Sequence, residues 1–176
     1  RLASKVPELD RRAYLYSNIA EESIKETNDQ AQAREILEEV ATTIAGAPST
    51  LVTARALFGL ASLYAKIDAN RAIGLLSDAV KCVNRLEAPD FSSQIVQIKV
   101  EGKLFGFYTL FQTPGFNPEN AFREFAKIHY DDAFYQAGTF ADKYTRALTT
   151  LAVAEICLQQ APLKPKSEKG KKKEKS

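Results

Sequence analysis

Apolar residues recur at three- and four-residue intervals between positions 13 and 83, and this spacing constrains the fold more than any other feature of the chain. Such spacing puts apolar side chains on one face of an α-helix. Asp10 and Asp29 are the predicted N-caps of two helices, and Gln32 completes a capping-box pattern with Asp29. Ser49 and Asp68 are the predicted N-caps of a third and a fourth helix. The sequence therefore predicts a mainly α fold.

The third and fourth predicted helices form a pair. The first of these helices carries two large residues, a small one and an aromatic one: Leu57, Leu60, Ala61 and Tyr64. The second carries a large residue between two small ones: Ala72, Leu76 and Ala79. This order resembles the tetratricopeptide pattern, although the link between the helices is one residue shorter than in that family and Leu57 stands where its consensus prefers Trp. Small residues let two antiparallel helices approach closely. We therefore expect a helical hairpin here.

A short repeat extends this interpretation. Residues 55–61 and 146–152 share the pattern R-A-L-x-x-L-A, and a weaker echo begins at Arg12. The intervals between the starts of these three segments correspond to one and two units of about 45 residues. This length is in the range of helical-hairpin arrays such as HEAT repeats. The predicted fold class is an α-solenoid of antiparallel helical hairpins in which one unit is altered.

The altered unit is predicted to contain a β-hairpin near residues 94–112. Val96, Ile98 and Val100 alternate with polar residues, and alternation resumes with aromatic residues after position 104. Strict alternation is typical of a strand, so the turn is expected at 101–103. A helix is the alternative, which Gly102 and Gly106 disfavour.

Charge divides the chain into two parts. The formal net charge is +2, but residues 164–176 hold seven Lys and two Glu, so the other residues are mildly acidic. We expect one helical-repeat domain at 1–163 and a disordered Lys-rich tail at 164–176. An acidic body disfavours a nucleic-acid-binding domain. The tail is either a solubilising end or a contact for polyanions through five lysines: Lys169, Lys171, Lys172, Lys173 and Lys175.

Catalytic and metal-binding patterns are not recognisable in the sequence. His129 is the single histidine, and no nucleophile motif accompanies it. The glycines do not form a phosphate-binding loop. Cys82 and Cys157 lack metal-ligand spacing and are expected to be small apolar core residues, with a disulfide between them as the alternative. The sequence predicts a protein that is not an enzyme, needs no cofactor and acts on no evident small-molecule substrate.

Aromatic residues are concentrated between positions 105 and 144, where twelve of the seventeen lie. One explanation is that bulky rings fill irregular gaps in the core. The other is a partner-binding face, because Tyr and Phe are enriched at interface centres. The candidate interaction surface comprises Tyr108, Phe116, Tyr130, Tyr135 and Tyr144.

The region from Leu57 to Leu158 also resembles the C-terminal part of large uncharacterised bacterial helical-repeat proteins. The resemblance is carried by the segments at 68–72, 114–116, 121–123 and 142–148. It implies a helical architecture and an extracytoplasmic parent protein, and it assigns no catalytic residue. The chain contains no Met, so we expect a fragment of a longer protein. It has no apolar run long enough to cross a bilayer.

These observations favour a non-enzymatic protein–protein interaction scaffold of helical-repeat type. The main alternative is an accessory helical domain of a larger exported or envelope protein, or of an enzyme, whose active part lies elsewhere. Polyanion binding through the tail is a third hypothesis. The sequence does not identify the protein or peptide partner, and it does not fix the localisation.

Overall fold

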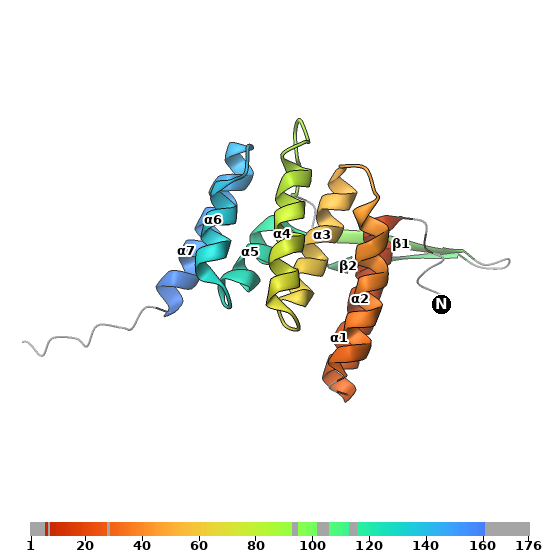
Figure 1. The fold of residues 1–176 in the computed structure, drawn as a ribbon. Coiled ribbons are helices and arrows are strands. Elements are labelled where there is room, and N and C mark those ends of the chain that lie inside the picture. The colour runs from red at the N-terminus through yellow and green to blue at the C-terminus, as the bar shows by residue number, and fades with distance from the viewer. Residues whose placement is uncertain are drawn as a thin grey trace, which may run out of the picture.

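Seven helices and one pair of strands make up the described part of the chain (Figure 1). A computed structural model describes residues 6, 8–27, 29–92, 95–101, 106–112 and 116–160. The helices are α1 (Leu9–Thr27), α2 (Gln30–Ala45), α3 (Leu51–Tyr64), α4 (Ala69–Val83), α5 (Pro118–Ala126), α6 (Tyr130–Gly138) and α7 (Lys143–Gln160). The strands are β1 (Ile95–Glu101) and β2 (Gly106–Gln112). None of the helices in these ranges is long and apolar enough to span a membrane.

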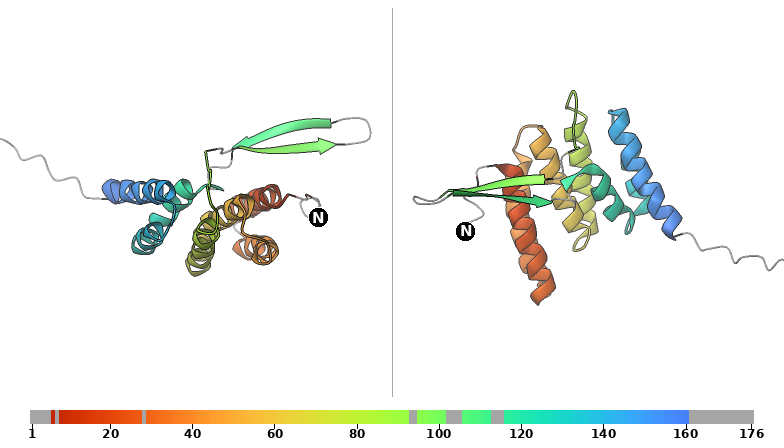
Figure 2. Two further views of the ribbon diagram at one scale, coloured as in Figure 1. Left: turned by 90° about the horizontal axis from the view of Figure 1, so that it is seen from above. Right: turned by 180° about the vertical axis from the view of Figure 1, so that it is seen from behind.

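The helices lie in two layers (Figure 2). Helices α1, α3, α5 and α7 form one row, in which each helix contacts the next, and α2, α4 and α6 form the second row. The rows are joined by contacts between α1 and α2, α3 and α4, and α5 and α6. The predicted pairing of the third and fourth helices is confirmed, because α3 and α4 pack against each other.

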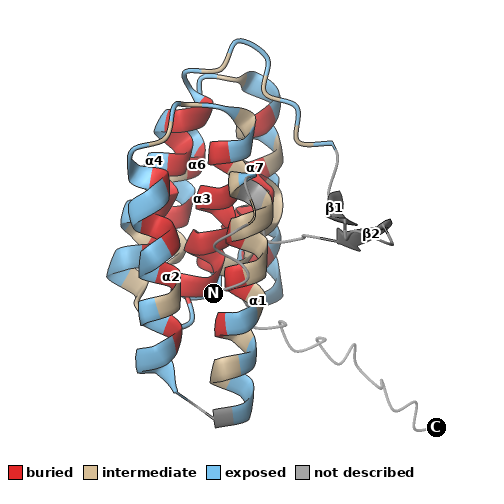
Figure 3. Ribbon diagram, turned by 90° about the vertical axis from the view of Figure 1, so that its right-hand side faces the viewer, coloured by how far each residue is buried: buried red, intermediate tan, exposed pale blue. Residues whose placement is uncertain are grey.

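Helix α3 occupies the centre of the bundle. It packs against α1, α2, α4 and α5, and eleven of its fourteen residues are buried. Small residues such as Ala54, Gly59 and Ala61 lie along it and allow neighbouring helices to approach from several sides. Buried residues accordingly follow the inner faces of the helices, whereas the outer faces are exposed (Figure 3).

Two of the four predicted N-caps are confirmed, one is displaced, and Asp10 is wrong because α1 already begins at Leu9. The side chains of Asp29 and Asp68 accept hydrogen bonds from the backbone N–H groups of Gln32 and Arg71. At the third helix the cap is Thr50 rather than Ser49. The Ser49 hydroxyl instead accepts a hydrogen bond from Arg85, at 3.2 Å. Either hydroxyl can cap a helix, so sequence alone does not choose between neighbours.

The predicted fold class is wrong in one respect. The chain is mainly α, but its helices form a compact bundle, and the strand pair near residues 94–112 is not inserted between helical hairpins of a solenoid. Strands β1 and β2 pair antiparallel, with Ile98 opposite Thr109, yet they lie beside the bundle and meet it along α1 (Figure 2). The reason is that α5 packs directly against α3. This contact closes the bundle without the strand segment, which lies outside it.

A polar cluster joins the second, third and fourth helices. Tyr64 on α3 is buried, and its hydroxyl donates to Glu38 on α2 at 2.8 Å. Arg71 on α4 donates to the same carboxylate at 2.7 Å. Burial, followed by the hydrogen bond to Glu38, raises the pKa of Tyr64 above its ordinary value. The phenol therefore remains a neutral donor throughout the physiological range.

Gly59 provides a test of the close packing around α3. A Cβ atom at this position would collide with the ring of Phe116, which is buried and also packs edge-on against Tyr14. We expect Gly59→Ala to destabilise the protein by about 1–3 kcal/mol, because the ring has to move within a packed core. Thermal and urea unfolding would measure this change.

Gly74→Ala is the matched control. Gly74 lies within α4 with open space around its Cα, so Ala there should increase stability by about 0.5–1 kcal/mol. If the two substitutions had the same effect, the contact between Gly59 and Phe116 would not limit the approach of the helices.

Candidate interaction surface

The structure places the aromatic residues of the predicted surface in different environments. Phe116 is buried in the core. Tyr130 is half-buried, and its ring stacks on Phe134 with 6.2 Å between centroids. Tyr135 and Tyr144 are each 71% exposed. The Tyr108 side chain lies outside the described residues, as do the tail lysines at 169–175. Of the five aromatics, Tyr135 and Tyr144 are the ones that the structure presents openly to solvent.

Further apolar residues accompany Tyr144 along the outer face of α7. Leu151 is 67% exposed and Leu158 is 77% exposed. The three residues are spaced seven apart, which puts them on one side of the helix. Thr149 and Val153 point the other way and are buried. Helix α7 therefore has a core-facing side and an outward apolar side that no described residue covers.

A pocket of about 480 Å³ opens beside Tyr144. Three segments that are distant in the sequence form its walls: residues 87–92 after α4, residues 117–119 at the start of α5, and residues 142–148 at the start of α7. Its larger apolar side chains are Pro89, Phe91, Pro118, Tyr144 and Leu148. Phe91 also packs edge-on against Phe58 of α3, at 5.8 Å between centroids, and so connects the pocket to the core.

Acidic side chains surround these apolar residues. Glu87, Asp90, Glu119 and Asp142 all line the pocket, and no Lys or Arg is among its lining residues. The backbone N–H of Ser92 donates to Asp90 at 2.8 Å and lowers the pKa of that carboxyl. This pocket therefore combines an apolar surface with a group of carboxylates at its edge.

Asp142 has a second role, as the residue that precedes α7. Its carboxylate accepts from the backbone N–H of Thr145 at 2.6 Å, and this hydrogen bond lowers the pKa of Asp142. The bond satisfies one of the free N–H groups in the first turn of the helix. One carboxylate thus stabilises the start of α7 and contributes negative charge to the pocket.

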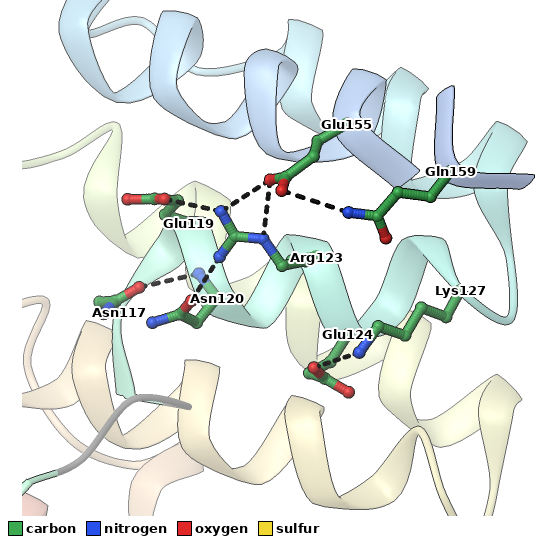
Figure 4. Close-up of polar contacts among 8 residues, drawn as sticks. All are labelled: Asn117, Glu119, Asn120, Arg123, Glu124, Lys127, Glu155 and Gln159. Atoms are coloured by element: carbon green, nitrogen blue, oxygen red, sulfur yellow. Dashed lines mark hydrogen bonds and ion pairs between the residues drawn. The ribbon is translucent and has the colours of Figure 1, made fainter. Parts of the chain in front are cut away.

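Arg123 holds two walls of the pocket together (Figure 4). Its guanidinium donates to Glu119 of the same helix at 2.8 Å and to Glu155 of α7 at 3.1 Å. It also donates to Asn120, whose backbone N–H donates in turn to the cap residue Asn117. The hydrogen bond to Glu119 is the main reason why the pKa of Arg123 is raised. The network fixes α5 relative to α7.

Asn84 fixes the third wall of the pocket, which is formed by residues 87–92 after α4. It follows α4, and its amide makes two hydrogen bonds to the segment between α6 and α7. The Nδ2 group donates to the Thr139 carbonyl at 2.9 Å, and Oδ1 accepts from the Ala141 N–H at 2.7 Å. Because Asp142 comes next in the chain, this pair of bonds sets the distance between the segment after α4 and the start of α7.

The residues considered for catalysis and metal binding do not converge. His129 stacks on Phe125, with its Nδ1 atom 3.9 Å from Asp132. Cys82 is buried as expected, but the expectation for Cys157 is wrong, because its side chain is exposed on the flank of α7. Both thiols are free. Within the described residues, no group of three His, Cys, Asp or Glu side chains is arranged to hold a metal ion.

Comparison with known proteins yielded no relative. No family model, no curated protein and no solved structure matches the chain. The resemblance to bacterial helical-repeat proteins therefore stays a prediction.

The contribution of Arg123 can be separated from that of an ordinary surface ion pair. We expect Arg123→Ala to lower the free energy of unfolding by about 1 kcal/mol, because it removes charged hydrogen bonds between two helices at a partly buried position. Lys127→Ala removes an exposed pair with Glu124 within α5 and should cost at most about 0.5 kcal/mol. Urea unfolding of both variants measures the difference, and equal losses would contradict the role given to Arg123.

Asp142 gives the stability a defined dependence on pH. The pKa of this carboxyl is lower in the folded protein, so its charge stabilises the fold above the unfolded pKa of about 3.9. That stabilisation is lost as the pH falls through the lowered folded value. Asp142→Asn keeps a capping oxygen but removes the charge.

We therefore expect wild type to be more stable than Asp142→Asn at pH 7, and the difference to vanish in acid. Urea unfolding at several pH values measures it. A difference that does not change with pH would show that the charge of Asp142 does not contribute.

Proposed function

We propose that this chain is a non-enzymatic protein–protein interaction scaffold whose outward α7 face contacts the partner. The observation that supports this proposal best is the row formed by Tyr144, Leu151 and Leu158. Each of these large apolar side chains is at least two-thirds exposed, although the opposite side of the same helix is packed into the core. Several large apolar side chains exposed along one side of a helix are typical of a surface on which a partner helix packs.

The position of α7 supports the same proposal. It is the last helix of its row, so one side packs on α5 and α6 and the other side faces outward (Figure 2). A spacing of seven residues is the one at which a second helix can lie alongside and bury the whole row. Tyr144 adds an aromatic residue, a type that is enriched among the energetically important residues of interfaces.

Site-specific photocrosslinking tests the proposal. A photoreactive amino acid replaces Leu151 in the full chain, and the control carries it at Lys81, which is exposed on α4. We expect a discrete crosslinked protein from position 151, at a yield several-fold above that from position 81. Adding Tyr144→Ser to the position 151 protein should reduce the yield without lowering the melting temperature, because Tyr144 is mostly exposed. Identical crosslinking profiles from the two positions would refute the proposed contact face.

A further inference from the structure

The pocket beside α7 combines two kinds of chemistry that one class of ligand satisfies. Phe91, Tyr144 and Leu148 offer apolar and aromatic surface, while Asp90 and Asp142 offer negative charge at the edge. An aromatic face next to carboxylates is the usual environment for an organic cation, since both the ring quadrupole and the carboxylates attract positive charge. The long apolar stem of a Lys or Arg side chain can also lie against such a surface while its charged end reaches the rim.

The charges around the pocket are only partly neutralised from within the chain. Arg123 pairs with Glu119, and Arg55 of α3 lies over the Phe91 ring with its guanidinium carbon 6.0 Å from the centroid. Glu87, Asp90 and Asp142 form no close ion pair among the described residues, although Arg55 attracts Asp90 and Arg146 attracts Asp142 from farther away. A net negative rim therefore faces an incoming ligand, which gives charge complementarity to a basic one.

A buried amide adds a hydrogen-bonding requirement. Asn117 lines the pocket, is 4% exposed and uses its Oδ1 atom to cap α5. Its Nδ2 group is buried and donates to no acceptor among the described residues. An unsatisfied donor of this kind costs free energy, so a ligand that brings a carbonyl oxygen into reach would lower that cost. A peptide backbone supplies such carbonyls, and a simple amine does not.

From these observations we infer that the pocket binds a basic peptide segment of the partner, in which a Lys or Arg side chain is adjacent to an apolar residue. The inference rests on the proposed function, because it specifies what the partner presents at the Tyr144 end of the α7 face. The cationic group lies among Glu87, Asp90 and Asp142, and the apolar residue lies against Phe91 and Leu148.

A comparison with a second pocket shows why the first one is preferred. That pocket, of about 290 Å³, lies between α2, α3 and α4 and contains Arg71 and Lys81. Both cations are already paired within the chain, with Glu38 and Asp78 respectively. A third cation of the lining, Arg85, donates to the Ser49 hydroxyl, and no unsatisfied buried donor of the lining residues points to a ligand there.

The test uses the full chain and three fluorescein-labelled synthetic peptides of about a dozen residues. The first contains lysines around a central Leu, the second has Glu in place of every Lys, and the third has Ser in place of the Leu. The protein variant Asp90→Asn/Asp142→Asn removes two charges while keeping amide oxygens that can accept the same backbone hydrogen bonds. Asp78→Asn, which removes an exposed carboxylate from α4, is the matched control. Fluorescence anisotropy measures the dissociation constants at low and at high salt.

We expect the Lys–Leu peptide to bind at least tenfold more tightly than either of the other peptides. Its dissociation constant should rise roughly tenfold in the double variant, remain unchanged in Asp78→Asn and increase with salt. The inference is overturned if the Lys–Leu peptide does not bind, or if the double variant binds it as tightly as wild type does. The photocrosslinking experiment at Leu151 does not use these carboxylates. If the Lys–Leu peptide does not bind but crosslinking from position 151 is specific, the proposed function stands and only the basic peptide is rejected.

Discussion

The close approach of α3 to its neighbours is the constraint on which the rest of the structure depends. Four helices pack on α3, which is possible because small residues alternate with large ones along it and because Gly59 leaves room for the ring of Phe116. Burial of this helix supplies much of the apolar area removed from water, the dominant favourable contribution to folding. Helices α2, α4 and α5 are placed by their contacts with this centre, and α6 and α7 are placed in turn by their contacts with α5.

The candidate site follows from that arrangement. Because α5 packs on α3 and α7 packs on α5, the starts of α5 and α7 lie close to the segment that follows α4. Arg123 and Asn84 hold these three segments in place from opposite sides. The same packing leaves α7 at the end of its row, so its outer face is not covered by another described helix. The pocket and the exposed apolar side chains of α7 therefore lie next to each other, because α7 is the last described helix of its layer.

Local features were predictable from the sequence because they depend on residues that are close together in the chain. The caps Asp29 and Asp68 are examples, since each cap accepts from an N–H three residues ahead. The pairing of α3 with α4 also followed from their short connection. The placement of residues 94–112 did not follow, because alternation describes a strand's own two faces and not what packs against it. A direct contact between α3 and α5 decided that question, and no sequence pattern encodes it.

The candidate site shows the same division. Tyr144 was named from the sequence as part of the candidate interaction surface, but Leu151 and Leu158 were not. Cys157 was misassigned for the same reason: without knowing which side of α7 meets α5, the exposed and buried sides cannot be told apart. The pocket had no signal in the sequence, because its carboxylates come from three separate segments.

Native-state hydrogen exchange tests the central claim, that α3 is the element on which the bundle depends. Amides protected only by local structure exchange through partial opening, whereas those at the centre exchange only when the whole protein unfolds. The account predicts that the amides of α3 are the slowest and that their opening free energy equals the free energy of global unfolding. Amides of α7 should exchange faster, because this helix packs on one side only. Slower exchange in α7 than in α3 would contradict the account.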